Sequence, residues 1–306
     1  MSLLSMIMPK GKNGFGYGST AEEVTQGVSL TGKTVLVTGC NSGLGKESMR
    51  ALALRGARIV GTARTEEKAE KACKEVGGEN ALGLACDLSE PSSVRACIQS
   101  IKELGIKLDV IICNAGIMAL PKLEKSYGYE LQFFTNHIGH YILVNGLLDE
   151  LTEEGRVVML SSSAHNMAPK EGIQFDNLDG EKSYRDWTAY GQSKFANLLF
   201  AKDLAERFKG TKKAAFSVHP GVIRTNLSRH LHPLANFLFG LIGPLFLKTV
   251  EEGAATQCYA ATAKDLTIHS GSYLQDCNIS KPRPDAENPE LARKLREESE
   301  RIITGL

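Results

Sequence analysis

A tyrosine and a lysine four residues apart, Tyr190 and Lys194, are the pair in this chain whose types and spacing could do acid–base chemistry. On a helix, residues i and i+4 lie on one face, so the ammonium would come beside the phenol. A free tyrosine loses its proton only near pH ~10, and a neighbouring cation lowers that pKa. The pair could then act as an acid or base near neutral pH. An ordinary surface pair is the alternative, and the two residues alone do not decide.

Composition excludes several classes of function. The 306 residues carry a formal net charge of +1, which gives no electrostatic basis for binding nucleic acid. The 7 cysteines are scattered without a Cys-x-x-Cys pair or a Cys/His cluster, so we expect reduced thiols and no metal site. His137 and His140 lack a carboxylate at matching spacing, and packing or capping roles are favoured for them, as for His165 and His219.

The N-terminal residues show neither a signal peptide nor a transmembrane helix. An apolar run at residues 3–8 is short, is stopped by Pro9 and lacks a basic start. Residues 10–18 are rich in Gly, Lys and Ser, which predicts a flexible approach. We expect an N-terminal extension at residues 1–29, a single domain at residues 30–306, and a cytoplasmic or cytosol-facing location.

A strand, a glycine-rich turn and a helix follow in the order that dinucleotide binding requires. Residues 33–38 are apolar and β-branched, and helix formers occupy residues 46–54. The turn between them permits close approach of its backbone to a pyrophosphate, and the helix N-terminus supplies N–H donors. A turn without a ligand is the alternative. The predicted cofactor contacts are Gly39, Asn41, Ser42, Gly43, Leu44 and Gly45.

The second predicted strand, residues 58–62, bears on the choice of cofactor. No carboxylate stands at its end, where one would bind the ribose 2′-OH of NAD. Arg64 stands there instead and can pair with a 2′-phosphate. The sequence therefore predicts NADP(H) in preference to NAD(H), with a solvated surface arginine as the alternative.

Strands and helices continue to alternate through the first half of the chain. We expect helices at residues 65–76 and 91–104 and strands at residues 81–86 and 108–113. Ligands bind outside the carboxyl ends of such parallel strands. Asp87 could accept from an adenine amino group, or could be only a turn residue. The predicted contacts at these strand ends are Asp87, Leu88, Asn114, Ala115 and Gly116.

Together with later motifs, these residues resemble the short-chain dehydrogenase/reductase family over residues 30–274. The later motifs are Asn136 in Thr-Asn-His-Ile-Gly-His, Ser161-Ser162-Ser163 after a strand at 156–160, and Pro220-Gly221-Val222-Ile223-Arg224-Thr225 after a strand at 214–219. The resemblance implies an α/β doubly wound parallel (Rossmann) sheet of strand order 3-2-1-4-5-6-7. Residues 175–182 look most like the retinol dehydrogenase branch, whose relatives include WW-domain-containing oxidoreductases and a plant chloroplast-envelope group.

The resemblance also implies roles for particular residues. Tyr190 exchanges a proton with the substrate oxygen, and Ser162 hydrogen-bonds that oxygen. Lys194 lowers the pKa of Tyr190 and holds the nicotinamide ribose, while Asn136 holds a water that relays protons. The further cofactor contacts implied are Tyr190, Lys194, Pro220, Gly221, Val222 and Thr225.

The resemblance places the substrate determinants around these residues. An insertion of about residues 164–187 is expected to form a pocket, and a lid at about 226–248 contains an apolar run. An NADP(H)-dependent oxidoreductase, or carbonyl reductase, acting on lipophilic alcohols, aldehydes or ketones is the leading interpretation. A catalytically silent NADP(H)-binding scaffold or sensor is the rival. Peripheral membrane contact through the apolar run is the alternative to a plain lid. A homodimer through helices at 130–151 and 190–208 would follow many relatives.

Overall fold

The computed structural model describes residues 3–223 and 247–306. Its main sheet has eight strands in the order β10-β9-β8-β7-β4-β1-β2-β3. The strands are β1 (Thr34–Thr38), β2 (Arg58–Ala63), β3 (Ala81–Ala85), β4 (Leu108–Cys113), β7 (Leu151–Leu160), β8 (Ala214–His219), β9 (Tyr273–Gln275) and β10 (Asn278–Ser280). The hairpin β5 (Lys125–Ser126) and β6 (Tyr129–Glu130) lies outside this sheet. The predicted α/β fold and strand order are therefore confirmed, with β10 as an added antiparallel edge strand.

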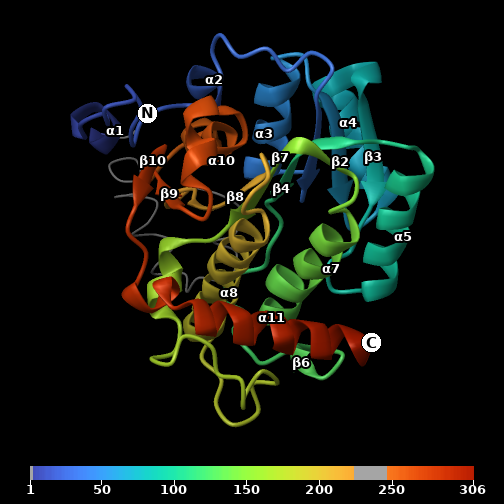
Figure 1. Ribbon diagram of the computed structural model, residues 1–306, viewed down its shortest axis with the longest axis vertical. Coiled ribbons are helices and arrows are strands. Elements are labelled where there is room, and N and C mark those ends of the chain that lie inside the picture. The colour runs from blue at the N-terminus through green and yellow to red at the C-terminus, as the bar shows by residue number, and fades with distance from the viewer. Residues whose placement is uncertain (1–2, 224–246) are drawn as a thin grey trace.

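Helices cover both faces of the sheet (Figure 1). One buried apolar cluster joins the sheet to α2 (Ala21–Val24), α3 (Gly43–Ala53), α4 (Glu66–Gly77) and α10 (Val250–Thr262). The other joins it to α5 (Pro91–Glu103), α6 (Leu131–Phe133), α7 (Gly139–Gly146), α8 (Asp186–Arg207) and α11 (Pro289–Thr304). A short helix, α1 (Leu3–Ile7), precedes them. Because both faces are covered, the central strands are near-continuous apolar runs, and all five residues of β1 are buried.

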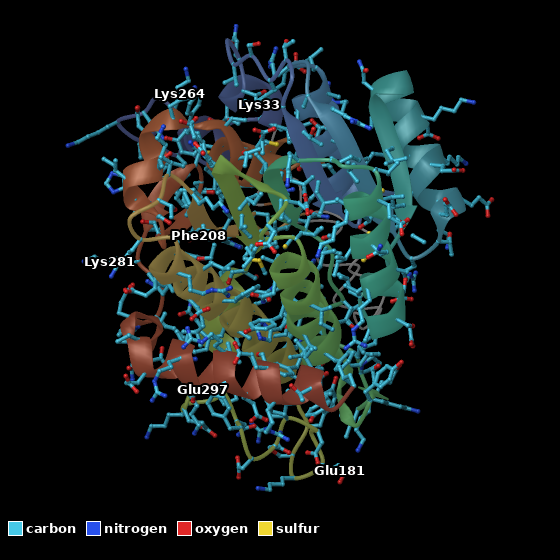
Figure 2. All side chains as sticks on the ribbon, turned by 45° about the vertical axis from the view of Figure 1, so that its right-hand side comes forward. Lys33, Glu181, Phe208, Lys264, Lys281 and Glu297 are labelled. Carbon is cyan, nitrogen blue, oxygen red and sulfur yellow. The ribbon has the colours of Figure 1, made fainter. Side chains whose placement is uncertain are left out.

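The parallel strands bring their carboxyl ends to one edge of the sheet. Pairing of β1 with β2 and β4, and of β7 with β4 and β8, is parallel throughout. In Figure 2, Lys33, which precedes β1, lies near one end of the molecule, and Glu181 of the insertion lies at the opposite end. Ligand sites are expected at the carboxyl ends of these strands.

The predicted helix at residues 130–151 is interrupted. After α6 the chain makes a π-helical turn, Phe134–Ile138, before α7 begins, and α7 ends at Gly146. β7 already begins at Leu151, so the strand predicted at 156–160 is longer than expected. π-helical turns occur often at functional sites, and this one holds Asn136.

The C-terminal helix α11 packs across α8, as Figure 1 shows. Arg296 of α11 donates to Asp203 of α8 at 2.9 Å, and Ser299 lies 2.9 Å from His137 Nε2. The apolar side chains of Leu295 and Ile302 are buried in this contact. Thus α11 of the same chain packs on α8, one of the two helices that the family resemblance assigns to a homodimer interface. The homodimer stays a prediction.

The segment predicted to be flexible, residues 10–18, packs against the body of the protein. Asn13 donates to Cys277 O at 2.7 Å, and the Phe15 ring meets the Tyr259 ring at 5.7 Å. Short local sequence cues missed these contacts because their partners lie in the last fifth of the chain. Residues 224–246, which include Thr225 and most of the predicted lid, lie outside the described residues. Within the part that is described, no helix is long and apolar enough to cross a membrane.

Candidate active site

The glycine-rich turn between β1 and α3 is shaped by close backbone contacts. A Cβ at Gly45 would lie 2.3 Å from Gly39 O, and one at Gly39 would lie 3.0 Å from Ala115 Cβ. Gly39 also has φ +68, in the left-handed region that favours glycine. Within α3, the first turn carries no acidic side chain, and Asn41 and Ser42 are exposed before it. The turn therefore fits an anion such as a pyrophosphate at a helix N-terminus.

Asn114, Ala115 and Gly116 join this turn to the centre of the site. Asn114 Nδ2 donates to Thr38 O at 2.8 Å, and the Ala115 N–H donates to Thr38 Oγ1 at 3.0 Å. A Cβ at Gly116 would lie 3.0 Å from Asn136 Oδ1 and 3.3 Å from Lys194 Nζ. The end of β4 is thus the meeting point of the predicted nucleotide turn and the predicted catalytic residues.

Tyr190 and Lys194 lie on α8, which begins four residues earlier than expected, and both are buried. Lys194 Nζ donates to Leu160 O at 3.1 Å and lies 5.7 Å from the centre of the Tyr190 ring. Among the three serines that follow β7, Ser161 Oγ donates to Lys194 O, whereas the Ser162 side chain lies close enough to the Tyr190 hydroxyl to lower its pKa. The middle serine is therefore the one placed beside the phenol.

Burial controls the protonation of this pair. Burial raises the pKa of Tyr190 to about 12, and the hydrogen bond from Ser162 acts in the lowering direction. Burial also lowers the pKa of Lys194 to about 8, with the Cys113 thiol acting the other way. Loss of hydration dominates both pKa values, because both groups are almost fully removed from water. The expectation that Lys194 lowers the pKa of Tyr190 stays a prediction.

The Asn136 side chain is held in place by hydrogen bonds to the loop after β4 and to α8. Its Oδ1 accepts from Ile117 N at 2.8 Å, and its Nδ2 donates to Ile117 O and to Ser193 Oγ, both at 2.9 Å. Both protons of Nδ2 are used, so this group has none left to donate to the predicted relay water. The side chain instead ties the π-helical turn to the loop after β4 and to α8.

His140 links the π-helical turn to β1, a role beyond the packing or capping expected for it. Its Nε2 lies 2.8 Å from Thr38 Oγ1, and its Nδ1 lies 2.8 Å from Asn136 O. The Asn136 carbonyl can only accept, so Nδ1 carries the proton, and in the neutral ring Nε2 then accepts from the Thr38 hydroxyl. Burial lowers the pKa of His140 to about 4, consistent with this neutral form. Its position four residues after Asn136 was the available sequence signal.

The predicted adenosine contacts lie at the ends of β2 and β3. Arg64 is exposed directly after β2. Asp87 Oδ1 accepts from the Ser89 backbone N–H at 3.0 Å and from its hydroxyl at 2.6 Å, so the turn role considered for Asp87 is real. Leu88 is buried, and a Cβ at Gly139 would lie 2.3 Å from its carbonyl oxygen.

The insertion at residues 164–187 forms the wall of a cavity. Its volume is about 240 Å³, and its lining includes Lys170, Gln174, Tyr184, Thr188 and Gln192. Arg283, which the sequence did not single out, anchors the insertion: its guanidinium donates to the carbonyls of His165, Ala168, Pro169 and Lys170 at 3.2–3.3 Å. Across the described residues no group of three His, Cys, Asp or Glu side chains could hold a metal ion.

Comparison with known proteins decides the family. The family model for short chain dehydrogenases matches residues 33–234. The chain belongs to the short-chain dehydrogenase/reductase family. The family's nicotinamide cofactor fits the residues present, because the glycine turn leaves the backbone open to a pyrophosphate beside an acid-free helix start.

Two relatives place this short-chain dehydrogenase/reductase within the family. Short-chain dehydrogenase TIC 32 B, chloroplastic, from Brassica napus is 38% identical over 320 residues, covering 100% of both chains. Retinol dehydrogenase 11 from Homo sapiens is 39% identical over 277 residues, covering 89% of this chain and 86% of the relative. The predicted resemblance to the retinol dehydrogenase branch and its plant relatives is confirmed.

Solved structures agree with the fold. An uncharacterized protein from Mycobacterium paratuberculosis superposes with a TM-score of 0.75 and 31% identity, over 91% of this chain and 96% of that one. A short chain dehydrogenase from Burkholderia cenocepacia, solved in complex with NADP, gives a TM-score of 0.65 over 80% of this chain and 96% of that one. At 22% identity, this second match supports the fold alone.

Proposed function

We propose that this short-chain dehydrogenase/reductase is an NADP(H)-dependent oxidoreductase acting on lipophilic alcohols, aldehydes or ketones. The observation that carries the proposal is the convergence of Tyr190, Ser162 and Lys194 at the strand ends, joined through Gly116 to the glycine-rich turn. The bound nicotinamide supplies or accepts the hydride. The protein's share is to bind, to orient and to handle the proton.

Tyr190 donates its phenol proton to the carbonyl oxygen in reduction and takes the hydroxyl proton in oxidation. Its pKa of about 12 keeps the phenol protonated at neutral pH, which is the form that reduction needs. Ser162 hydrogen-bonds the same oxygen and stabilises the charge that develops there. Ser162 follows the end of β7 and Tyr190 lies in the first turns of α8, and holding both groups in place keeps the reacting geometry.

Lys194 holds the nicotinamide ribose and carries a positive charge beside Tyr190. One of its three protons goes to Leu160 O, which leaves two donors for ribose hydroxyls. With a pKa of about 8, it is mostly protonated at pH 7. In oxidation, this charge and that of the oxidised nicotinamide both favour the phenolate.

Preference for NADP(H) is supported by the residue after β2. Arg64 is exposed at that strand end, where a 2′-phosphate would lie, and the strand itself ends without a carboxylate. Asp87 and Leu88 would contact the adenine from the neighbouring strand end.

A lipophilic substrate is supported by the relatives, which include retinol dehydrogenases 11, 12 and 14. Tyr190 does not line the cavity between the insertion and α8, so the substrate proposal rests on these relatives and not on that cavity. We also propose that residues 1–29 form an extension and that residues 30–306 form the domain. A cytoplasmic or cytosol-facing location is a further proposal.

Turnover tests the proposal against the rival, a silent NADP(H)-binding scaffold or sensor. Oxidation of NADPH is followed with a panel of carbonyls that includes retinal, long-chain aldehydes and short polar aldehydes. We expect turnover with lipophilic members and little with short polar ones. Tight NADPH binding without turnover on any member would instead support the scaffold, and a clear preference for NADH would refute the cofactor assignment.

A further inference from the structure

Lys248 is a fully buried lysine that the proposed reaction does not use. The residue is 1% exposed, and lysines at such depth are rare unless they are paired. Its Nζ donates to Asp276 Oδ1 at 2.6 Å and lies 4.6 Å from the centre of the Tyr17 ring. A carboxylate and an aromatic face therefore enclose the ammonium, and both contacts are strongest where water is excluded.

The rest of Lys248 supports the turn that follows β8, Pro220-Gly221-Val222. Its backbone N–H donates to Val222 O at 2.9 Å, and it pairs with Ile223 in a parallel bridge. Its stem crosses Gly221 so closely that a Cβ there would lie 2.6 Å from Lys248 Cδ. Gly221 has φ +97, so the turn depends on a glycine both for its conformation and for this approach.

The partners of Lys248 come from opposite ends of the chain. Asp276 lies in the turn between β9 and β10 at φ 51, a conformation that aspartate tolerates better than most residues. Tyr17 belongs to the N-terminal segment, which Asn13 also ties to this turn through Cys277 O. The ammonium therefore holds together the N-terminal segment, the β9–β10 turn and the turn after β8.

This cluster lies on the catalytic side of the site. In the sheet, β8 neighbours β7, whose end leads into Ser162, whereas Arg64 and Asp87 follow β2 and β3 on the other side. His219, the residue before the turn, accepts from Ser163 N at 3.1 Å through Nδ1. The turn after β8 is thus connected to the serines that follow β7. It lies where the nicotinamide half of the cofactor would bind, on the other side from the strand ends expected to bind the adenosine half.

A buried lysine–carboxylate pair contributes little net stability compared with apolar residues of similar size, so stability is a poor reason for its presence here. We propose that Lys248 is a positioning residue for the nicotinamide half of the cofactor. Held by Asp276 and Tyr17, it fixes the Pro220-Gly221-Val222 turn in its binding conformation. The inference rests on the proposed NADP(H) function and gives the N-terminal segment a part in supporting the site.

The test compares two ligands that differ in the nicotinamide half. Lys248→Met keeps an apolar stem and removes the charge. Isothermal titration calorimetry gives the affinities for NADPH and for 2′,5′-ADP, which carries only the adenosine half with its 2′-phosphate. We expect the affinity for NADPH to fall about tenfold. This is less than the ~100-fold by which a misplacement of ~1 Å can lower a reaction rate. The affinity for 2′,5′-ADP should stay within about twofold, because its contacts lie at β2 and β3.

Further variants separate positioning from stability. Tyr17→Leu and Asp276→Asn should shift the NADPH affinity in the same direction as Lys248→Met, and Lys248→Arg should restore part of it. Arg156→Met is the matched control, because Arg156 binds Ala260 O and Ala263 O and stands midway along β7, away from the strand end. It should lower the free energy of unfolding without changing the ratio of the two affinities.

Each outcome decides the matter. Equal weakening of both ligands in Lys248→Met would mark a general loss of structure and overturn the positioning role, as would unchanged NADPH binding. If Lys248→Met does not fold, Tyr17→Leu decides by the same ratio, since it keeps the ion pair. A wild-type protein that binds neither nucleotide would refute the proposed cofactor itself, and the positioning role with it.

Discussion

At the scale of single residues, burial determines which protons are held in the site. Tyr190 is kept protonated and Lys194 loses affinity for its proton for the same reason, since both are removed from water. Ser162 acts directly on the phenol, while Asn136 and His140 use their polar groups to fix backbone. The catalytic side chains are therefore positioned by polar contacts that are already satisfied within the protein.

Arg64 carries the prediction about cofactor choice. Arg64→Leu should weaken NADPH binding about tenfold or more, because an arginine–phosphate pair is charge-assisted and is worth roughly 1.5–3 kcal/mol. NADH binding should change by less than about twofold, since NADH has no 2′-phosphate. The measurement is the ratio of the two dissociation constants in wild type and variant. An equal loss for both cofactors would show that Arg64 does not contact the 2′-phosphate.

The types of the site residues could be predicted from the sequence, but their physical roles could not. Tyr190, Lys194 and Ser162 were found because their motifs are short and local. The pKa of Tyr190 depends on the depth of burial, and the role of His140 depends on Thr38, which lies far away in the chain. Neither the depth of burial nor a contact with a distant residue can be predicted from a local motif.

At the scale of elements, the site is built where strand ends meet interrupted or tightly packed helices. Strands and helices with strong periodicity were predicted within one or two residues, as for β4 and β8. The π-helical turn at Phe134–Ile138 was missed because Ile117 and Ser193 stabilise it from other elements. β10 was missed because three residues on a tight hairpin give almost no pattern.

The glycine-rich turn gives a prediction at this scale. Gly45→Ala should lower both the free energy of unfolding and the affinity for NADPH, because the added Cβ would lie 2.3 Å from Gly39 O and 2.6 Å from Asn114 Nδ2. Gly210→Ala is the control: it has φ +78 and open space around its Cβ, so it should cost only the ~1 kcal/mol of a left-handed residue. Urea unfolding and nucleotide titration measure both. Normal NADPH binding by Gly45→Ala would contradict the packing described for the turn.

At the scale of the whole molecule, both chain ends support the site. The N-terminal segment reaches Lys248 through Tyr17, and α11 reaches the π-helical turn through Ser299 and His137. These contacts join residues more than a hundred positions apart, and a local sequence pattern does not indicate such contacts. The prediction that residues 10–18 are flexible was wrong for this reason. The sheet order, in contrast, followed from the family resemblance alone.

Buried histidines should make the whole fold sensitive to acid. Burial lowers the pKa of His137 to about 3 and those of His140 and His219 to about 4. The unfolded chain, with histidine pKa near ~6.5, then binds more protons between about pH 4 and 6.5, so stability rises with pH through that window and is lost as pH falls. At pH 5, each of these histidines should cost about 2 kcal/mol relative to pH 7.5.

His140→Gln isolates one of these contributions. The substitution should lower the free energy of unfolding by about 2 kcal/mol less at pH 5.0 than at pH 7.5. At pH 5.0 only the wild type bears the cost of keeping His140 neutral. Denaturant titrations at the two pH values give this difference. His269→Gln is the control, since His269 is exposed. The same loss at both pH values would show that His140 is not held neutral by the fold.

The central claim is that Tyr190 handles the substrate proton, and Tyr190→Phe tests it most directly. The control is Tyr141→Phe, which removes a hydroxyl that donates to Glu300 of α11. With NADPH and a lipophilic aldehyde, Tyr190→Phe should lose roughly 10²–10⁴-fold in kcat, while its NADPH affinity stays within about twofold and Tyr141→Phe keeps its turnover. Full turnover by Tyr190→Phe, with NADPH still bound, would contradict the account.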